Sequence, residues 1–278
     1  MKRAASLLGI ALIMAGCGTS PRGGYYEDDG PHANPRDVST VPDAVPRTEP
    51  RAASGNKPYT VMGKTYHPVS DARGYRERGV ASWYGKKFHG RRTSSGEPYD
   101  MYAMTAAHRT LPLPSYVRVR NLRNGSSVVV RVNDRGPFLH NRLIDLSYAA
   151  ASRLGIVATG TGLVEVEAIA PDAPVTSVAT RPAVEIISSA QAAPAARRDP
   201  TLYVQAGAFS QWDNAMGLRQ RLESAGLGPV FIESATAEAS GARIYRVRLG
   251  PVASVEAGDR LSEQLAAQGV VDAHLIVE

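Results

Sequence analysis

The stretch VRVNDRGPF, residues 130–138, combines a strand-like pattern with a carboxylate that lies between two arginines. With a two-residue repeat, Val130, Val132 and Asp134 would share the core-facing side of a strand. Asp134 would then lie at the mouth of a domain, where partial desolvation favours the protonated form that a general acid needs. The residues alone leave a second interpretation equally open, because Asn, Asp and Gly before Pro are common in turns.

Two other side chains are candidates for the same chemistry. Glu97, in TSSGEPYD, lies in an expected loop, where a solvated carboxylate is the simplest interpretation. His108 ends the stretch MYAMTAAH (residues 101–108), which we predict to be a helix. An imidazolium is favoured at a helix C-terminus, so capping is the simplest role for His108.

Other kinds of chemistry find little support. Four histidines, His67, His89, His108 and His140, lack the spacing of zinc ligands, and we expect neither a metal nor a cofactor. The chain contains no G-x-S-x-G motif for a serine nucleophile. Trp83 and Tyr84 could form a sugar-stacking platform, but core packing is the simpler interpretation in a small domain.

The elements that must position Asp134 lie in residues 79–170. Short segments there alternate between apolar and polar residues, and Asn124-Gly125 is a strong hairpin signal. A helix is predicted over residues 147–154, with Gly155 as its stop. Several short strands with an inserted helix predict a small closed barrel.

Residues 200–278 predict a second domain. They read as strand, helix (212–225), strand, strand, helix (254–268) and strand, which indicates an α+β sandwich with helices on one sheet face. The alternation places Tyr203, Gln205, Arg246 and Arg248 on the open face, where they could hydrogen-bond sugar hydroxyls. A merely solvated sheet face is the rival interpretation.

The remaining segments predict export and flexible spacing. Residues 1–17 pair Lys2 and Arg3 with a short apolar run and end at Cys17, the only cysteine. Residues 18–78, rich in Pro, Gly, Asp and Arg, predict a disordered tether, and residues 171–199 an Ala/Pro-rich linker. The net charge of +6 is concentrated in residues 79–170, which suits an anionic envelope polymer better than nucleic acid in an exported protein.

Three motif groups carry a resemblance to a known family. The sequence LIMAGC resembles a bacterial lipobox, whose cysteine is lipidated, and Gly18 after it implies the outer membrane. The motifs GVASWYG, HGRRTSSGEPYDMYAMTAAHRTLP, VRVNDRGPF and IDLSYAAASRLG resemble the rare lipoprotein A (RlpA) family. The motifs YVQAGAF and YRVRLGP resemble a sporulation-related (SPOR) repeat.

The resemblance implies a six-stranded double-psi β-barrel followed by a small βαββαβ SPOR domain. It implies lytic transglycosylase activity on peptidoglycan strands that lack stem peptides, with 1,6-anhydromuramic acid ends. Asp134 would be the leading acid/base, with Glu97 and His108 as active-site partners. The protein would be a monomeric outer-membrane lipoprotein that faces the periplasm and gathers at the division septum.

Two alternatives remain. An inverting glycoside hydrolase would use Asp134 as acid and Glu97 as base for water, whereas a transglycosylase closes the muramyl 6-hydroxyl on C1. A non-catalytic, expansin-like wall protein would keep the barrel without turnover.

Overall fold

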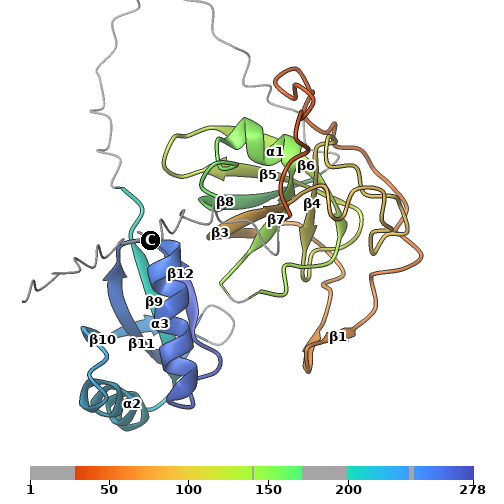
Figure 1. Ribbon diagram of the computed structural model, residues 1–278. Helices are drawn as coiled ribbons and strands as arrows, with labels where there is room; N and C mark the ends of the chain where they lie inside the picture. Colours follow the sequence, from red (N-terminus) through yellow and green to blue (C-terminus); the bar gives the residue numbers. More distant parts are fainter. Residues whose placement is uncertain (1–28, 140, 171–198, 238–240) are drawn as a thin grey trace, which may run out of the picture.

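The first module of the computed structural model, which describes residues 29–139, 141–170, 199–237 and 241–278, is a closed six-stranded barrel (Figure 1). Its strands are β3 (Arg76–Tyr84), β4 (Thr105–His108), β5 (Ser115–Asn121), β6 (Ser127–Asp134), β7 (Ile144–Ser147) and β8 (Gly162–Ile169). They close in the order β3-β7-β4-β6-β5-β8, with parallel pairs β3/β7 and β4/β6 and antiparallel pairs elsewhere. The six-stranded barrel prediction is therefore confirmed.

The barrel core is apolar, and its one helix has the predicted ends. Val130, Val132 and Leu146 are fully buried in the core, together with other aliphatic side chains from all six strands. Helix α1 (Tyr148–Leu154) begins where Ser147 Oγ accepts a hydrogen bond from Ala150 N at 3.2 Å. It ends at Gly155, whose φ of 72° is left-handed, as a glycine stop requires.

The helix predicted for residues 101–108 is wrong. Residues 101–104 form turns and bends, and Thr105–His108 form strand β4 between β6 and β7. Small apolar residues suit a helix as an isolated peptide, but here the backbone hydrogen bonds of two neighbouring strands decide the conformation. His108 consequently ends a strand and has no helix dipole to complement.

The segment before the barrel departs from the predicted disordered tether over its described part. Residues 29–75 lie on the barrel and include a hairpin of β1 (Tyr59–Val61) and β2 (Lys64–Tyr66). Val38 is buried in the barrel core cluster, and Ala44 N donates to Val129 O at 3.0 Å. Other contacts are hydrogen bonds of single side chains, such as Arg51 and Asn56, which leave no periodic pattern in the sequence.

The second module is a four-stranded antiparallel sheet with two helices on one face, as predicted (Figure 1). Its elements are β9 (Leu202–Phe209), α2 (Trp212–Ser224), β10 (Val230–Thr236), β11 (Arg243–Val252), α3 (Val255–Ala267) and β12 (His274–Val277). The sheet order is β10-β11-β9-β12, so the chain follows the βαββαβ arrangement.

The two modules contact each other beside β3 and β12 (Figure 1). Val80 and Leu163 of the barrel belong to the apolar cluster of the second module. The side chain of Asn141 donates to Asp259 in α3 at 2.9 Å and accepts from Leu275 N at 2.8 Å. The arrangement thus combines an apolar contact with a buried polar one.

Two predicted segments lie outside the described residues. These are the signal segment 1–17 with Cys17, and all but the last residue of the linker 171–199. Across the described ranges, no helix has the length and apolar character needed to cross a bilayer.

Candidate active site

A β-bulge in β6 turns Asp134 onto the outer face of the barrel. In the β4/β6 pairing, Ala106 lies opposite Val132 and Ala107 lies opposite Asp134, so Asn133 is an extra residue. A bulge of this kind reverses the direction of the side chain that follows it. Asp134 therefore does not share the core-facing side of Val130 and Val132, which corrects the predicted strand face.

The same register brings a second carboxyl group to this face. Ala107 is also the partner of Asp145 in β7, so Asp134 and Asp145 flank it from opposite sides. All three side chains belong to one row across the sheet, and Ala107 has only a methyl group there. The outer face of β6, β4 and β7 thus presents two carboxyl groups on either side of a small residue.

Asp134 is held by three donors. Its Oδ1 accepts from Ser94 N, Ser94 Oγ and Arg135 N, each at 2.7 Å. The two bonds from Ser94 join Asp134 to a residue 40 positions earlier in the chain, which a plain turn residue would not need.

Asp145 has the opposite environment and was not among the predicted site residues. Burial raises the pKa of the half-buried Asp145 carboxyl to about 6, a rise opposed by the hydrogen bond from Ser82 Oγ. The charges of Arg142 and Arg109 also oppose the rise, and the charge of Asp134 adds to it. The sequence IDLS gives only an acidic residue in a short strand, so nothing local marks it as a site.

The hydroxyl of Tyr84 lies near both carboxyl groups. The pKa of Tyr84 is raised by burial first, and then by the charges of Asp134 and Asp145. Its hydroxyl is buried and has no hydrogen-bond partner among the described residues. The ring stacks on Tyr99 with centroids 4.0 Å apart, so Tyr84 packs in the core as expected.

Glu97 lies beside the carboxyl pair and is held by arginine. Arg131 Nη1 and Nη2 donate to the two Glu97 oxygens at 2.8 and 2.9 Å, and Asn133 Nδ2 donates at 3.2 Å. The hydrogen bonds from Arg131 hold the pKa of Glu97 below its usual value. Glu97 is therefore an ionised carboxylate, and its side chain, 43% exposed, remains accessible to a ligand.

The His108 side chain is buried and binds backbone groups of the following turn. Its Nδ1 accepts from Thr110 N and Leu111 N at 3.2 and 3.0 Å. Burial lowers the pKa of His108 to about 3, so the expected imidazolium is wrong and the ring is neutral. The ring instead fixes the turn whose Leu111 O accepts from Arg135 Nη1 at 2.6 Å.

The four predicted glycan-binding residues lie on the open face of the second module. Arg248 is paired in register with both Phe231 and Gln205, and Tyr203 packs edge-on against Phe231 at 5.4 Å. Arg248 is buried between Glu233 and Glu278, at 2.6 and 2.5 Å. Within the described chain, Arg248 Nε and Gln205 Oε1 are buried without a hydrogen-bond partner, whereas Arg246 is half-buried.

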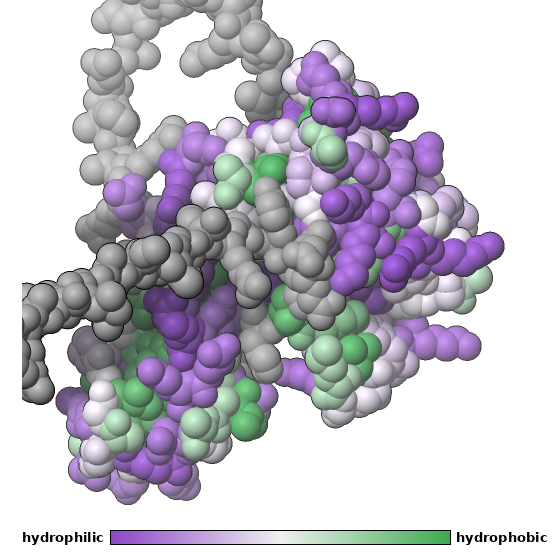
Figure 2. All heavy atoms as spheres, in the orientation of Figure 1, coloured by the Kyte–Doolittle hydropathy of each residue, from purple (hydrophilic) through white to green (hydrophobic). Residues whose placement is uncertain are grey.

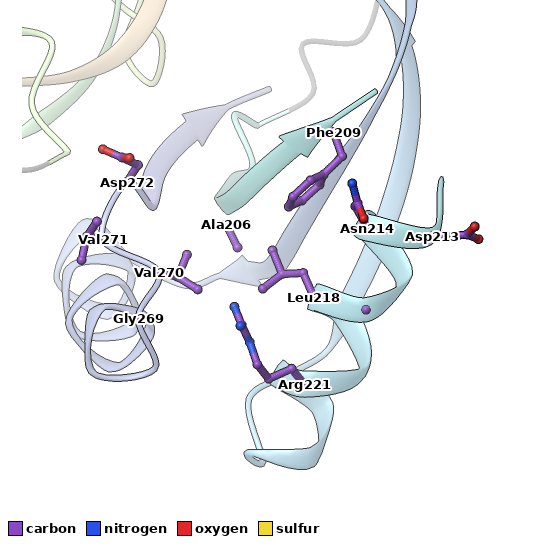
Figure 3. Close-up of a pocket in the computed structure, with 11 residues that line it drawn as sticks. Ala206, Phe209, Asp213, Asn214, Leu218, Arg221, Gly269, Val270, Val271 and Asp272 are labelled. Carbon is purple, nitrogen blue, oxygen red and sulfur yellow. The ribbon is translucent and has the colours of Figure 1, made fainter. Parts of the chain in front are cut away.

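The opposite face of this module contains a groove of about 500 Å³ (Figure 3). Phe209, Leu218 and Arg221 point into the space between α2 and the turn that carries Val270. None of the predicted binding residues lines it. The structure therefore separates the open face, with the predicted binding residues, from a groove of mixed polar and apolar lining on the helical face.

Among the described residues, no group of three or more His, Cys, Asp and Glu side chains has a geometry that could hold a metal ion.

Comparison with known proteins supports both modules. A family model described as lytic transglycolase matches residues 76–167, and a SPOR domain model matches residues 199–275. A Pseudomonas aeruginosa protein named endolytic peptidoglycan transglycosylase RlpA is 44% identical over 274 residues, which cover 82% of this chain and 78% of that protein. A Vibrio cholerae protein of the same name is 43% identical, covering 97% and 95%.

Among solved structures, the SPOR domain of RlpA from P. aeruginosa is similar to this chain at 32% identity. It covers 27% of this chain and 96% of that domain, with a TM-score of 0.25.

Proposed function

We infer that the chain, which belongs to the RlpA family and is a lytic transglycosylase with a peptidoglycan-binding SPOR domain, divides its acid–base work between two carboxyl groups. The observation that carries this proposal is the opposite environments of Asp134 and Asp145 on one face of the barrel. Titratable pairs whose surroundings favour different protonation states commonly serve as acid and base.

In the proposed reaction Asp145 donates its proton to the leaving oxygen as the bond from muramyl C1 breaks. Asp134, held by its three hydrogen-bond donors, stabilises the positive charge that develops at C1 and accepts the proton of the muramyl 6-hydroxyl. That oxygen then bonds to C1 and closes the 1,6-anhydro ring. Asp134 then releases its proton to solvent and Asp145 takes one up, which restores the pair.

Glu97 and His108 have supporting roles in this scheme. Glu97, fixed by Arg131, offers a carboxylate to sugar hydroxyls next to the reacting ring and adds negative charge near C1. His108 is a positioning residue, because its ring and backbone oxygen hold the turn and the Arg135 guanidinium beside Asp134.

The physiological substrate is proposed to be peptidoglycan strands without stem peptides. Tyr203, Gln205, Arg246 and Arg248 on the open SPOR face would bind such strands and concentrate the enzyme at septal wall. Cys17 would carry the lipid that anchors a monomeric protein in the outer membrane, facing the periplasm. The lipobox-like sequence and the buried, unpartnered polar atoms of the open face support these assignments.

Mass analysis of products tests the reaction. Purified protein with peptide-free glycan should release fragments ending in 1,6-anhydromuramic acid, and Asp134→Asn should slow release by roughly 10²–10⁴. Asp71→Asn, an exposed control in the segment before the barrel, should cut like the native chain. New reducing ends would favour an inverting hydrolase, and glycan binding without products would favour a wall-loosening protein.

A further inference from the structure

The segment before the barrel packs beside Asp134, the proposed catalytic carboxylate. This segment precedes the residues that match the lytic transglycolase family. Ser54 Oγ donates to Ser94 O at 2.8 Å, and Ser94 is the residue that binds Asp134. Arg135 Nε donates to Gly55 O at 2.8 Å. Residues 54 and 55 are thus joined to the two residues that hold the catalytic carboxylate.

The close fit at Gly55 shows that this contact is specific. Its φ is +85°, and an added Cβ would lie 2.8 Å from Leu113 Cδ1 and 2.9 Å from Ser94 O. Asn56 also pairs with the backbone of Leu113, accepting from its N at 2.8 Å and donating to its O at 2.7 Å. A loosely tethered chain would not need a glycine at this position.

Three aromatic rings extend this contact. Tyr59 and Tyr66 of the β1–β2 hairpin stack with centroids 5.3 Å apart, and Phe138 lies 6.1 and 5.7 Å from them. Figure 2 shows hydrophobic side chains gathered at this hairpin, on an otherwise largely hydrophilic barrel surface. The rings are half-buried, so part of each remains in contact with solvent.

The rings lie next to the carboxyl pair. A Cβ built on Gly136 would be 3.8 Å from the Phe138 ring and 4.0 Å from Asp145 Oδ2. The charge of Asp134 also acts on the Tyr59 hydroxyl, although burial is the main reason why the pKa of Tyr59 is raised. A sugar on these rings would therefore neighbour the sugar that reacts.

A cavity of about 540 Å³ lies beside two of these rings, Tyr59 and Phe138, and beside Ser94 and Arg135, the residues that bind Asp134. Residues 53–55, 57–59 and 61 line it together with Ser94, Arg135 and Phe138. Its surface is largely apolar, but Lys57 is exposed and makes no ion pair with another described residue. This combination of rings and a free ammonium group suits a ligand that has an apolar face and a negative charge.

We propose that residues 53–66 and Phe138 form a saccharide subsite in which Tyr59 and Phe138, supported by Tyr66 packed against both, hold a pyranose ring and Lys57 binds a free lactyl carboxylate. The inference rests on the proposed function. The C–H face of a sugar can pack on aromatic rings, and the lactyl ether of muramic acid ends in a carboxyl group. That carboxyl is ionised in a strand without stem peptides and is a neutral amide once a peptide is attached, so this subsite selects peptide-free strands.

The test measures kcat/KM of full-length variants on two soluble glycans of equal length, one with free lactyl carboxylates and one with the same groups converted to amides. Lys57→Gln should lower kcat/KM about three- to tenfold on the free acid and leave the amide unchanged. Arg123→Gln is the matched control. Arg123 is also exposed, but it lies in the turn before the first residue of β6, whereas Asp134 is the last residue of that strand.

The ring contribution is tested on the same glycans. Tyr66→Ala should raise KM on both glycans about tenfold with little change in kcat, and Tyr66→Phe should restore the native KM because it keeps the ring. Unchanged thermal unfolding of Lys57→Gln and Tyr66→Phe would establish that the fold is intact.

The outcomes separate this inference from the proposed function. If the native protein releases no anhydro products, the proposed function fails. If it does release them, but Lys57→Gln lowers kcat/KM equally on both glycans or on neither, the assignment of Lys57 to the lactyl carboxylate is overturned. If Tyr66→Ala leaves KM unchanged on both glycans, the aromatic subsite is overturned.

Discussion

The variant Asp145→Asn tests whether Asp145 is a proton donor in the reaction or a carboxyl group that only stabilises the fold. With a pKa of about 6, roughly nine-tenths of Asp145 is protonated at pH 5 and roughly one-tenth at pH 7. The kcat of the native enzyme on peptide-free glycan should therefore fall about tenfold between these pH values. Asp145→Asn should reduce kcat by roughly 10²–10⁴ and remove that fall, because the amide has no proton to give.

The fold should tolerate this change. The amide oxygen of Asn can still accept from Ser82 Oγ, as Asp145 does. The folded pKa is raised above the ordinary 3.8, so the folded protein binds more protons between about pH 4 and 6, and Asp145 lowers stability as pH rises through that window. Asp145→Asn should consequently unfold at pH 7 at a temperature no lower than the native protein.

The assay is a stopped-time measurement of anhydro ends from pH 4.5 to 8, at saturating glycan, with thermal unfolding measured in the same buffers. Asp71→Asn serves as the control for a general effect of removing a negative charge. A pH profile of Asp145→Asn parallel to that of the native enzyme, or a kcat within a few-fold of it, would refute the assignment of Asp145 as donor.

Three further predictions concern the rest of the chain. Glu49→Gln should destabilise the protein by roughly 1–3 kcal/mol at pH 7 in urea unfolding, because Arg131 loses a charged partner. Hydrogen bonds from Arg131 lower the pKa of Glu49 to about 2. The stability that Glu49 contributes is therefore complete above about pH 4.5 and is lost as pH falls through 2. A variant that is still less stable than the native protein at pH 2 would argue against this explanation. Cys17→Ala should abolish labelling by a fatty-acid analogue and release the protein into the periplasm, and a variant that keeps the label would disprove anchoring at Cys17. Deleting residues 200–278 should disperse a fluorescent fusion from septa while residues 29–170 still cut soluble glycan, and septal enrichment of the shortened protein would contradict the targeting role.

The sequence predicts the regular elements well because their signals are local. Ser147 and Gly155 bound α1 at the predicted ends, and the alternation of β9 and β11 places the polar SPOR residues on the open face. The failures share a non-local cause. Residues 105–108 are a strand because two neighbouring strands pair with them, and residues 29–75 are ordered by individual side chains that bind distant backbone atoms.

The bulge at Asn133 explains why the sequence marks Asp134 as a candidate but does not mark Asp145. A regular β6 would direct Asp134 into the apolar core beside Val132, where a carboxylate would be costly to bury. One extra residue turns it outward instead, into the row of Asp145 and within reach of Ser94. Since the strand alternation predicts the wrong face at this point, Asp145 cannot be paired with Asp134 from the pattern alone. The two carboxyl groups differ in what surrounds them, since three donors converge on Asp134, whereas at Asp145 burial outweighs the one hydroxyl. Restoring the regular register would therefore be expected to remove catalysis even with both carboxyl groups still in the chain.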